Sequence, residues 1–431
     1  MRKLLALTTA VAVLTTGCSV DTRRATNLTS SSATLNAVVH CDANSRGTAW
    51  WEMRKSGAAW QLAGSQGSFV CPATTHALQV SKNLAGLRAG VRYDFRLGAD
   101  PGARGGRVLY SSPGSFVTER FSPGIVSSAD HALSALAAGT LGANLVRVEF
   151  DIDTPVSAMR TTIDQLARAG ARPLLLAGFE GRIPTEAEAQ NLARWAAAFG
   201  PGGSFWVGRR DWQLAVQQIE FGNETSYSYQ YGDSYADASY ANRAEQYATR
   251  FAQARAAIAM TGREVGLLAQ ADDGGSGSSN WVDHMFRAVP NLGNLVGGWS
   301  VHPYGPRSRW EPKIDRLIAS TAAHGAPASI PIDVTEYGIT SDNGANLSGN
   351  SDGWPTNFTY AQAAAALDQT IAAMRLDPSL GPRLRDFMIY AAHDLRAQGT
   401  TQDREQHFGV LQNNLAGKGA YSTEVRAQLD N

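Results

Sequence analysis

From about residue 120 onward, short apolar segments alternate with longer helical segments, and this alternation constrains the fold more than any other feature. Strand and helix in regular alternation predict parallel β/α units. The strand candidates number eight, which is the number that closes a barrel. They are residues 123–127, 145–150, 173–177, 215–221, 264–269, 296–301, 329–335 and 386–391. We therefore predict a (β/α)8 TIM barrel over residues 120–431, because the remaining length of about 310 residues is typical of one such barrel.

Helix signals lie between these strand candidates. Thr185 and Glu188 have capping-box spacing, which predicts a helix that begins after Thr185. Residues 238–260 form an Ala-rich run, and residues 360–376 carry Ala and Leu at helical spacing. These segments support the α/β fold class.

Residues 25–119 have a different pattern, with short strand-like runs between turn signals and no helical periodicity. The runs are residues 33–39, 48–54, 77–80, 92–97 and 115–118. Such spacing predicts a small all-β sandwich. The segment from Leu84 to Tyr93 resembles the corner before the sixth strand of fibronectin type III domains, where a Tyr hydroxyl bonds back to the backbone. That resemblance implies a spacer or adhesive module without catalysis.

Residues 1–18 have the composition of a targeting segment. Arg2 and Lys3 precede an apolar stretch at 4–14 that is too short to span a bilayer. The following Thr-Thr-Gly-Cys resembles a bacterial lipoprotein signal, in which Cys18 becomes the lipidated first residue and anchors the protein to a membrane. Lipidation and ordinary signal cleavage both stay open. Either one implies export, to the cell envelope or to the extracellular space.

Cys41 and Cys71 are the other cysteines of the chain. Both lie in the small N-terminal domain, where an oxidising compartment would let them form a disulfide. Two unrelated buried thiols are the alternative. We expect the disulfide, because small exported domains often need such a crosslink.

Charge and histidine placement exclude some classes of function. Lys+Arg and Asp+Glu are equal at 38 each and the pI is about 7.1, so the chain as a whole lacks the basic character of nucleic-acid-binding proteins. His302, His393 and His407 are isolated in sequence and lack metal-ligand spacing. We therefore expect no metal and no cofactor.

Polar residues at the carboxyl ends of barrel strands are the candidates for function. A carboxylate at the end of a buried strand is costly unless it has partners or a chemical role. Two candidates are of this kind, Glu224 after the fourth strand and Glu336 after the seventh. The full set is Arg147, Glu149, Asn223, Glu224, His302, Tyr304, Glu336, His393 and Asp394.

Three motifs at these strand ends carry a resemblance to a known group of enzymes. They are Asn223-Glu224, His302-Pro303-Tyr304 and Thr335-Glu336-Tyr337-Gly338. In this order, the motifs resemble the retaining (β/α)8 glycoside hydrolases of clan A, with families 39 and 5 nearest. Two features depart from that pattern. Thr225 follows Asn-Glu where many members have Pro, and Tyr390-Ala391-Ala392-His393 occupies the region where many have a Trp.

The resemblance implies a role for each residue. Glu336 would be the nucleophile and Glu224 the general acid and base, as double displacement requires. Arg147 and Tyr304 would hold down the pKa of Glu336, and Asn223 would bond the sugar 2-hydroxyl. We expect structural salt bridges for Glu149 and Glu220. The expected substrate-binding residues are Asn223, Arg147, His302, Tyr304, Tyr227 and His393.

These observations predict an exported retaining glycoside hydrolase that cleaves β-glycosidic bonds of a polysaccharide or oligosaccharide. The alternative is a non-catalytic glycan-binding protein of the cell envelope that keeps the barrel as a scaffold. The sugar, the linkage and the choice between endo and exo cleavage depend on loop shape and stay open.

Overall fold

The computed structural model describes residues 18–26, 28, 32–64, 66–85, 87, 91–100, 108–118, 121–231, 237–272 and 280–430. The chain divides into two compact units. One holds residues 33–84 and 92–117 with the strand before them, and the other holds residues 118–431 with two short linking segments. Within the described ranges, no helix combines the length and the apolar character that crossing a membrane requires. The predicted signal, apart from Cys18, lies outside the described residues.

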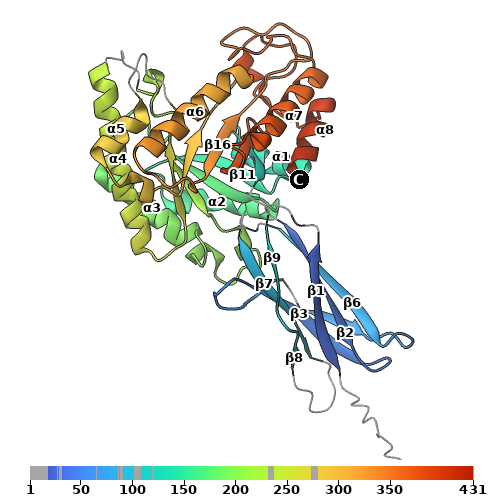
Figure 1. The fold of residues 1–431 in the computed structure, drawn as a ribbon. Coiled ribbons are helices and arrows are strands. Elements are labelled where there is room, and N and C mark those ends of the chain that lie inside the picture. Colours follow the sequence, from blue (N-terminus) through green and yellow to red (C-terminus); the bar gives the residue numbers. More distant parts are fainter. Residues whose placement is uncertain are drawn as a thin grey trace, which may run out of the picture. The chain divides into compact units, whose positions relative to one another are not determined.

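The N-terminal unit consists of two antiparallel sheets (Figure 1). One sheet has the order β1-β2-β6, with β1 (Ser19–Thr26), β2 (Ala33–His40) and β6 (Ala77–Leu84). The other has the order β4-β3-β7-β8, and β5 pairs with β3 while β9 pairs with β7. Its strands are β3 (Arg46–Lys55), β4 (Gln61–Leu62), β5 (Gly67–Val70), β7 (Arg92–Asp100), β8 (Leu109–Tyr110) and β9 (Gly114–Val117). The first strand begins at Ser19, ahead of the domain start at residue 25 that the sequence suggested.

Aromatic residues fill the sandwich core because alternate residues of each strand face the opposite sheet. Phe95 and Leu97 of β7 are each 1% exposed. Trp51 packs on Phe95 with ring centroids 6.0 Å apart, and Tyr93 stacks on Phe116 at 5.6 Å. Residues 86 and 88–90 of the segment that resembles a fibronectin type III corner lie outside the described residues.

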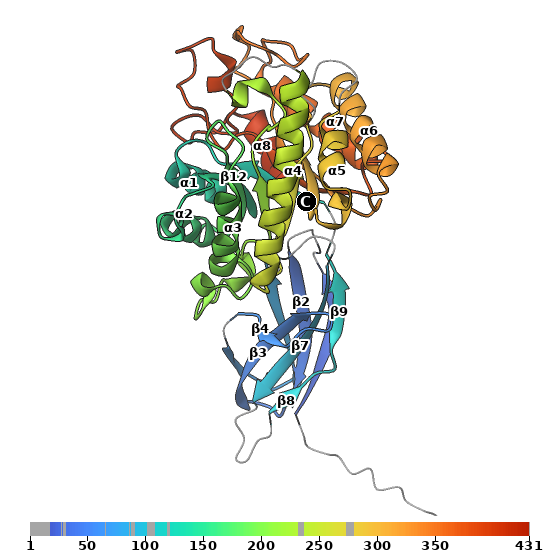
Figure 2. The ribbon, with the colours of Figure 1, turned by 90° about the vertical axis from the view of Figure 1, so that its left-hand side faces the viewer.

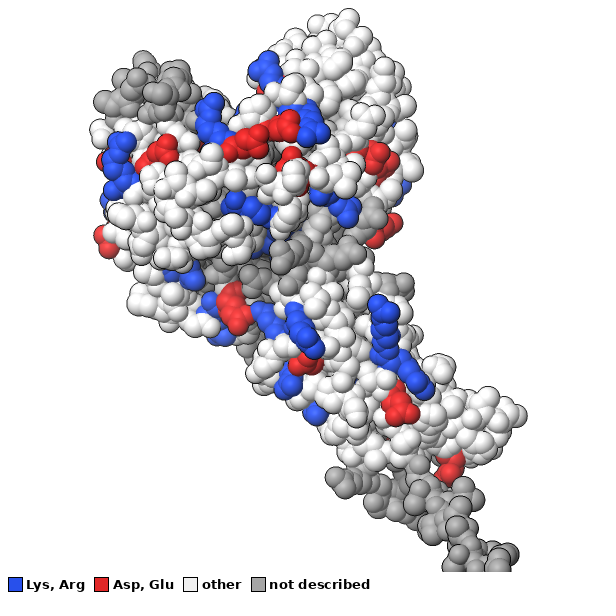
Figure 3. Space-filling model, in the orientation of Figure 1, with Lys and Arg blue, Asp and Glu red and all other residues white. Residues whose placement is uncertain are grey.

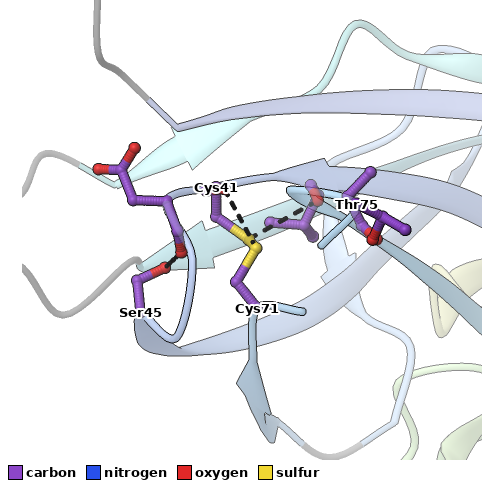
Figure 4. Close-up of a disulfide and its surroundings, with 7 residues drawn as sticks. Cys41, Ser45, Cys71 and Thr75 are labelled. Carbon is purple, nitrogen blue, oxygen red and sulfur yellow. Dashed lines mark hydrogen bonds between the residues drawn. A yellow bond between two sulfur atoms is a disulfide. The ribbon is translucent and has the colours of Figure 1, made fainter. Parts of the chain in front are cut away.

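Cys41 and Cys71 form a disulfide (Figure 4). Cys41 directly follows β2 and Cys71 directly follows β5, so the bond joins the two sheets of the sandwich. Backbone hydrogen bonds run from Asn44 N to Cys71 O at 3.0 Å and from Cys71 N to Ser45 O at 2.9 Å. The crosslink closes a loop with a sequence separation of 30.

The C-terminal unit is a closed barrel of parallel strands in sequence order, β10 to β17. Every strand overlaps its predicted segment, and the (β/α)8 prediction is confirmed. The strands are β10 (Ser122–Val126), β11 (Leu145–Asp151), β12 (Arg172–Gly178), β13 (Gln218–Phe221), β14 (Gly266–Gln270), β15 (Gly298–Val301), β16 (Ile332–Tyr337) and β17 (Leu384–Ile389).

One α-helix follows each barrel strand in the described part of the chain, and Figure 2 shows α3 and α4 side by side on the outside of the barrel. Thr185 caps α3 through the predicted capping box with Glu188. The helices are α1 (His131–Leu141), α2 (Val156–Arg168), α3 (Glu186–Phe199), α4 (Asp237–Met260), α5 (Trp281–Ala288), α6 (Arg307–Ala323), α7 (Tyr360–Leu376) and α8 (Ala420–Leu429).

The two-residue period of the strands builds the barrel interior in layers. On β11, Leu145 joins an apolar layer inside the barrel, and Arg147 and Glu149 follow on the same face toward the carboxyl end. Val146 and Val148 belong to the larger core between the strands and the helices. The layer that contains Leu145 consists of Val126, Leu145, Leu174, Leu268 and Met388. This alternation fixes which polar side chains reach the open end of the barrel.

A charged pair lies elsewhere inside the barrel. Arg385 donates to both carboxylate oxygens of Asp333, at 2.8 and 2.7 Å, and both residues are buried. Gly298 of β15 makes room for this pair, because a Cβ at Gly298 would lie 2.2 Å from Asp333 Oδ2. Asp333 therefore has a structural partner of its own.

Candidate active site

Arg147 of β11 connects three of the predicted site residues. Its Nη1 donates to Glu336 Oε1 at 2.6 Å, and its Nη2 donates to Asn223 Oδ1 at 2.8 Å. Its Nε donates to Glu220 Oε2 at 2.6 Å. Arg147 is only 3% exposed. Burial by itself lowers the pKa of Arg147, but Glu220 and Glu336 outweigh burial and raise it, so the guanidinium is a fixed positive charge.

Glu220 of β13 lies inside the barrel with no exposed surface. Burial tends to raise the pKa of its carboxyl, but Arg147 and His302 outweigh this effect and lower the pKa to about 2. Glu220 Oε1 also accepts a hydrogen bond from the Thr335 hydroxyl at 2.7 Å. The expected structural role of Glu220 agrees with this geometry, because its anion orients both Arg147 and Thr335.

Glu336 of β16 receives a second hydrogen bond from Tyr304, whose hydroxyl lies 2.9 Å from Glu336 Oε2. Burial, together with the charge of Glu336, raises the pKa of Tyr304 well above its ordinary value. The phenol therefore stays protonated and donates. Arg147 and Tyr304 hold one oxygen each, which fixes the carboxylate plane of Glu336.

Glu224 follows β13 after a tight turn. Gly222 has φ of 81° and Glu224 itself has φ of 45°, a left-handed conformation that is uncommon for a residue with a side chain and concentrates at functional sites. Tyr229, in the short helix η3 (Ser228–Gln230), donates its hydroxyl to Glu224 Oε2. Glu224 Oε1 lies 3.0 Å from His302 Nδ1.

His302 contacts Glu224 through Nδ1 and Thr335 through Nε2, and the donor of the second contact can be assigned. Thr335 donates its single hydroxyl hydrogen to Glu220, so His302 Nε2, at 3.1 Å from Thr335 Oγ1, must be the donor in that contact. Burial lowers the pKa of His302, but Glu336, Glu220 and Glu224 outweigh burial and raise it well above its ordinary value. For Glu224, burial raises the pKa, His302 lowers it and Glu336 raises it, with a net rise. The net rise favours the protonated form of Glu224, as a general acid requires.

Replacement of His302 by Gln should move the alkaline limb of any pH–rate profile that depends on protonated Glu224. The positive charge of His302 favours ionised Glu224, so its removal raises the pKa of Glu224. Loss of activity with rising pH then begins at a higher pH. The measurement is kcat/KM against pH, with His324→Gln as control because His324 lies on the outer helices. An alkaline limb that stays in place or moves to lower pH contradicts the assignment.

A cavity of about 580 Å³ opens at the carboxyl ends of the strands. Both candidate carboxylates line it. The predicted residues that line the cavity are Arg147, Asn223, Glu224, Tyr304, Glu336 and His393. His302 lies behind Glu224 as its hydrogen-bond partner. Among the described lining residues Tyr229 is present and Tyr227 is not; Tyr227 stacks on Tyr229 with ring centroids 5.4 Å apart.

Sequence reasoning missed several residues of the cavity. The carboxylate of Glu149, expected in a structural salt bridge, forms no ion pair or hydrogen bond with any described residue and lines the cavity instead. The sequence placed Glu149 among the strand-end candidates, but a structural role was expected for it. The rings of Tyr390 and Phe408 are in edge-to-face contact, with their centroids 5.2 Å apart. Both rings line the cavity near the end of β17. Asp352 comes from the loop between β16 and α7, and Glu405 belongs to the short helix η5 (Arg404–Gln406).

Glu224, His302 and Glu336 are the described residues with ligand atoms close enough to hold a metal ion, all within 4.8 Å of one another. Their present contacts account for this proximity. Both His302 nitrogens already face Glu224 and Thr335, and Glu336 is held by Arg147 and Tyr304. The buried guanidinium of Arg147 lies beside the carboxylate of Glu336, and its positive charge disfavours binding of a second cation there. The donor set therefore fits proton transfer better than metal binding.

On the face drawn in Figure 3, basic and acidic side chains are interspersed, in keeping with their equal counts of 38.

Comparisons with known proteins found no matching family model and no matching curated protein. Among solved structures, the chain is similar to a GH2 β-galacturonidase from Eisenbergiella tayi (11% identity, 95% of this chain and 71% of that one, TM-score 0.44). It is also similar to a glucosidase from Croceicoccus marinus, at 14% identity over 72% of this chain and 67% of that one, with TM-score 0.48. A β-glucosidase from Thermotoga maritima matches at 9% identity over 70% of this chain and 88% of that one, with TM-score 0.45. At such identities, activity must be argued from the site itself.

Proposed function

We propose that this protein is a retaining glycoside hydrolase that cleaves β-glycosidic bonds of an oligosaccharide or polysaccharide. One observation carries the proposal: Glu224 and Glu336 line one cavity, with a carboxylate oxygen of each within 4.8 Å of the other. Carboxyl groups about 5–5.5 Å apart suit double displacement, whereas direct inversion needs about 6.5–9.5 Å to admit a water molecule. The close spacing therefore favours retention.

The proposed reaction has two steps. In the first, Glu336 attacks the anomeric carbon while Glu224 gives its proton to the leaving glycosidic oxygen, so the glycosidic bond breaks and a glycosyl ester forms. In the second, Glu224 takes a proton from water, the water oxygen attacks the anomeric carbon, and the ester bond breaks. Asn223, held by Arg147, would bond the sugar 2-hydroxyl, where a hydrogen bond strengthens in the transition state.

The stereochemistry of the first product tests this proposal. Proton NMR during hydrolysis of aryl β-glycosides and β-linked oligosaccharides should show the β-anomer first, followed by mutarotation. The α-anomer as first product would establish inversion and exclude the covalent route. Absence of hydrolysis across neutral, amino and acidic sugars would favour the glycan-binding alternative.

We also propose that the sandwich is a fibronectin type III-like module and that the protein is exported with a lipid on Cys18. The disulfide between Cys41 and Cys71 supports export, because such bonds persist in oxidising compartments. Cys18 is a free, partly exposed cysteine directly before β1. We expect Cys18→Ser to release the protein from the membrane fraction of a bacterial host. Equal membrane association of the variant and the wild type contradicts the anchor.

A further inference from the structure

Lys418 is a buried cation that the proposed reaction does not use. It lies just before α8 and has no exposed surface. Its Nζ donates to Asp394 Oδ1 at 2.7 Å and to the backbone oxygens of Ser341 and His407, each at 3.1 Å. Carbonyl oxygens only accept, and Asp394 Oδ1 also accepts from Gly409 N at 2.8 Å. Three acceptors require three N–H groups, so Lys418 is the charged ammonium.

The three acceptors belong to the loops that follow the last two barrel strands. Ser341 lies in the loop between β16 and α7, and Asp394 and His407 lie in the loop between β17 and α8. One ammonium thus joins both loops to the start of α8. Asp394 is also buried, and the loss of one member of a buried ion pair leaves the other charge uncompensated. Lys418 therefore fixes where these two loops lie at the carboxyl end of the barrel.

Residues next to these acceptors line the active-site cavity. His393 precedes Asp394 in the chain and lines the cavity, and Phe408 follows His407 and lines it as well. Lys418 itself is not among the described lining residues. Its influence on a bound substrate therefore passes through the loops that it holds, and not through direct contact.

Phe408 connects this buried lysine to the proposed nucleophile. Its ring packs edge to face on the ring of Tyr304, with centroids 5.9 Å apart, and the Tyr304 hydroxyl donates to Glu336 Oε2 at 2.9 Å. The guanidinium of Arg404 lies 5.0 Å from the centroid of the Phe408 ring. A Cβ at Gly338 would lie 2.7 Å from Phe408 Cδ1, so the ring has little room to turn. A shift of the Phe408 backbone would therefore be passed on to Tyr304.

We propose, on the basis of the proposed function, that Lys418 is a positioning residue for the reaction. Through the backbone of His407 and the ring of Phe408, its ammonium holds the Tyr304 hydroxyl against Glu336. Asp394, one of the strand-end candidates from the sequence, serves as the counter-ion of Lys418. The orientation of the Glu336 carboxylate for attack depends on this chain of contacts.

A double-mutant cycle with Tyr304→Phe tests the proposal. Lys418→Met removes the charge and should lower kcat/KM for an aryl β-glycoside by about 10- to 100-fold, the cost of a displaced catalytic group. Tyr304→Phe removes the hydroxyl that Lys418 positions, so in that background Lys418→Met should cost less than about threefold. Lys313→Met, at an exposed lysine on α6, should leave kcat/KM unchanged in both backgrounds.

A second variant guards against loss of the fold. Lys418→Met leaves the carboxylate of Asp394 buried without its cation, which is destabilising. If that variant does not fold, Lys418→Met combined with Asp394→Asn removes both charges and takes its place in the cycle. Rates are taken per folded molecule, with the folded fraction measured by near-UV circular dichroism.

The outcomes separate this inference from the proposed function. Equal costs of Lys418→Met in the two backgrounds would show a general effect on stability and overturn the positioning role, with the hydrolase intact. Full activity of Lys418→Met would overturn it as well. If the wild type cleaves no glycoside, the proposed function fails, and crystal structures of the wild type and Lys418→Met decide the inference. A Tyr304 hydroxyl that has left Glu336 supports it, and a retained hydrogen bond refutes it.

Discussion

Replacement of Glu336 by Gln is expected to lower kcat on any substrate that the wild type cleaves by about 10⁴-fold or more. The amide keeps the size of the side chain: its oxygen can still accept from Arg147, and its NH2 group can donate to the Tyr304 hydroxyl. It cannot attack the anomeric carbon, so the covalent route closes. Steady-state kinetics on an aryl β-glycoside and on the best oligosaccharide provide the measurement.

A matched control tests whether the loss of activity is specific to position 336. Glu311→Gln removes the same charge from an exposed (i, i+4) pair with Arg307 on α6 and should retain wild-type rates. A 2-deoxy-2-fluoro glycoside with a good leaving group should trap the intermediate, and mass spectrometry of peptides should locate it on Glu336. A label on another residue, or a Glu336→Gln variant within tenfold of wild type, contradicts the assigned nucleophile.

Replacement of Glu224 by Gln is expected to give the second-largest loss, about 10²–10⁴-fold in kcat/KM for unactivated oligosaccharides. The loss should be far smaller for dinitrophenyl glycosides, because that leaving group departs without a proton. The alkaline limb of the pH–rate profile should vanish, since burial and Glu336 raise the pKa of Glu224 and set that limb in the wild type.

Added azide provides a second measurement on the Glu224→Gln variant. Azide needs no general base, so it should speed turnover of the dinitrophenyl glycoside and yield a β-glycosyl azide. Equal losses for good and poor leaving groups would mean that residue 224 does not transfer a proton. An α-glycosyl azide would mean that the intermediate is not covalent.

The barrel was predictable because its signals are local. Eight apolar strands separated by helices need about 310 residues and leave few alternatives to a closed parallel barrel. The two-residue strand period also fixes that Leu145, Arg147 and Glu149 share one face. The pairing of Cys41 with Cys71 was expected from their number and position, and the structure contains that bond.

Other parts of the site depend on contacts between distant segments. Tyr227 was expected to bind substrate, but the fold instead places the neighbouring Tyr229 hydroxyl on Glu224. In the sequence, Glu149 and Glu220 have the same local pattern, because each is a charged residue on a barrel strand. Glu220 pairs with Arg147, whereas the carboxylate of Glu149 has no described partner. Which of two similar anions is neutralised depends on the neighbouring strands and loops, and local sequence does not encode their approach.

The sequence by itself determined the eight-fold strand–helix repeat and which strands end in Glu224 and Glu336, because strand period and helix capping act between residues close in the chain. The tertiary structure decided what surrounds those carboxylates. It brought His302, Thr335 and Glu220 into one hydrogen-bonded chain that begins at Glu224, and Arg147 links Glu220 to Glu336. It left the carboxylate of Glu149 and His393 Nε2 without partners among the described residues. Desolvation and charge pairing depend on three-dimensional packing, so they emerge only when the barrel closes.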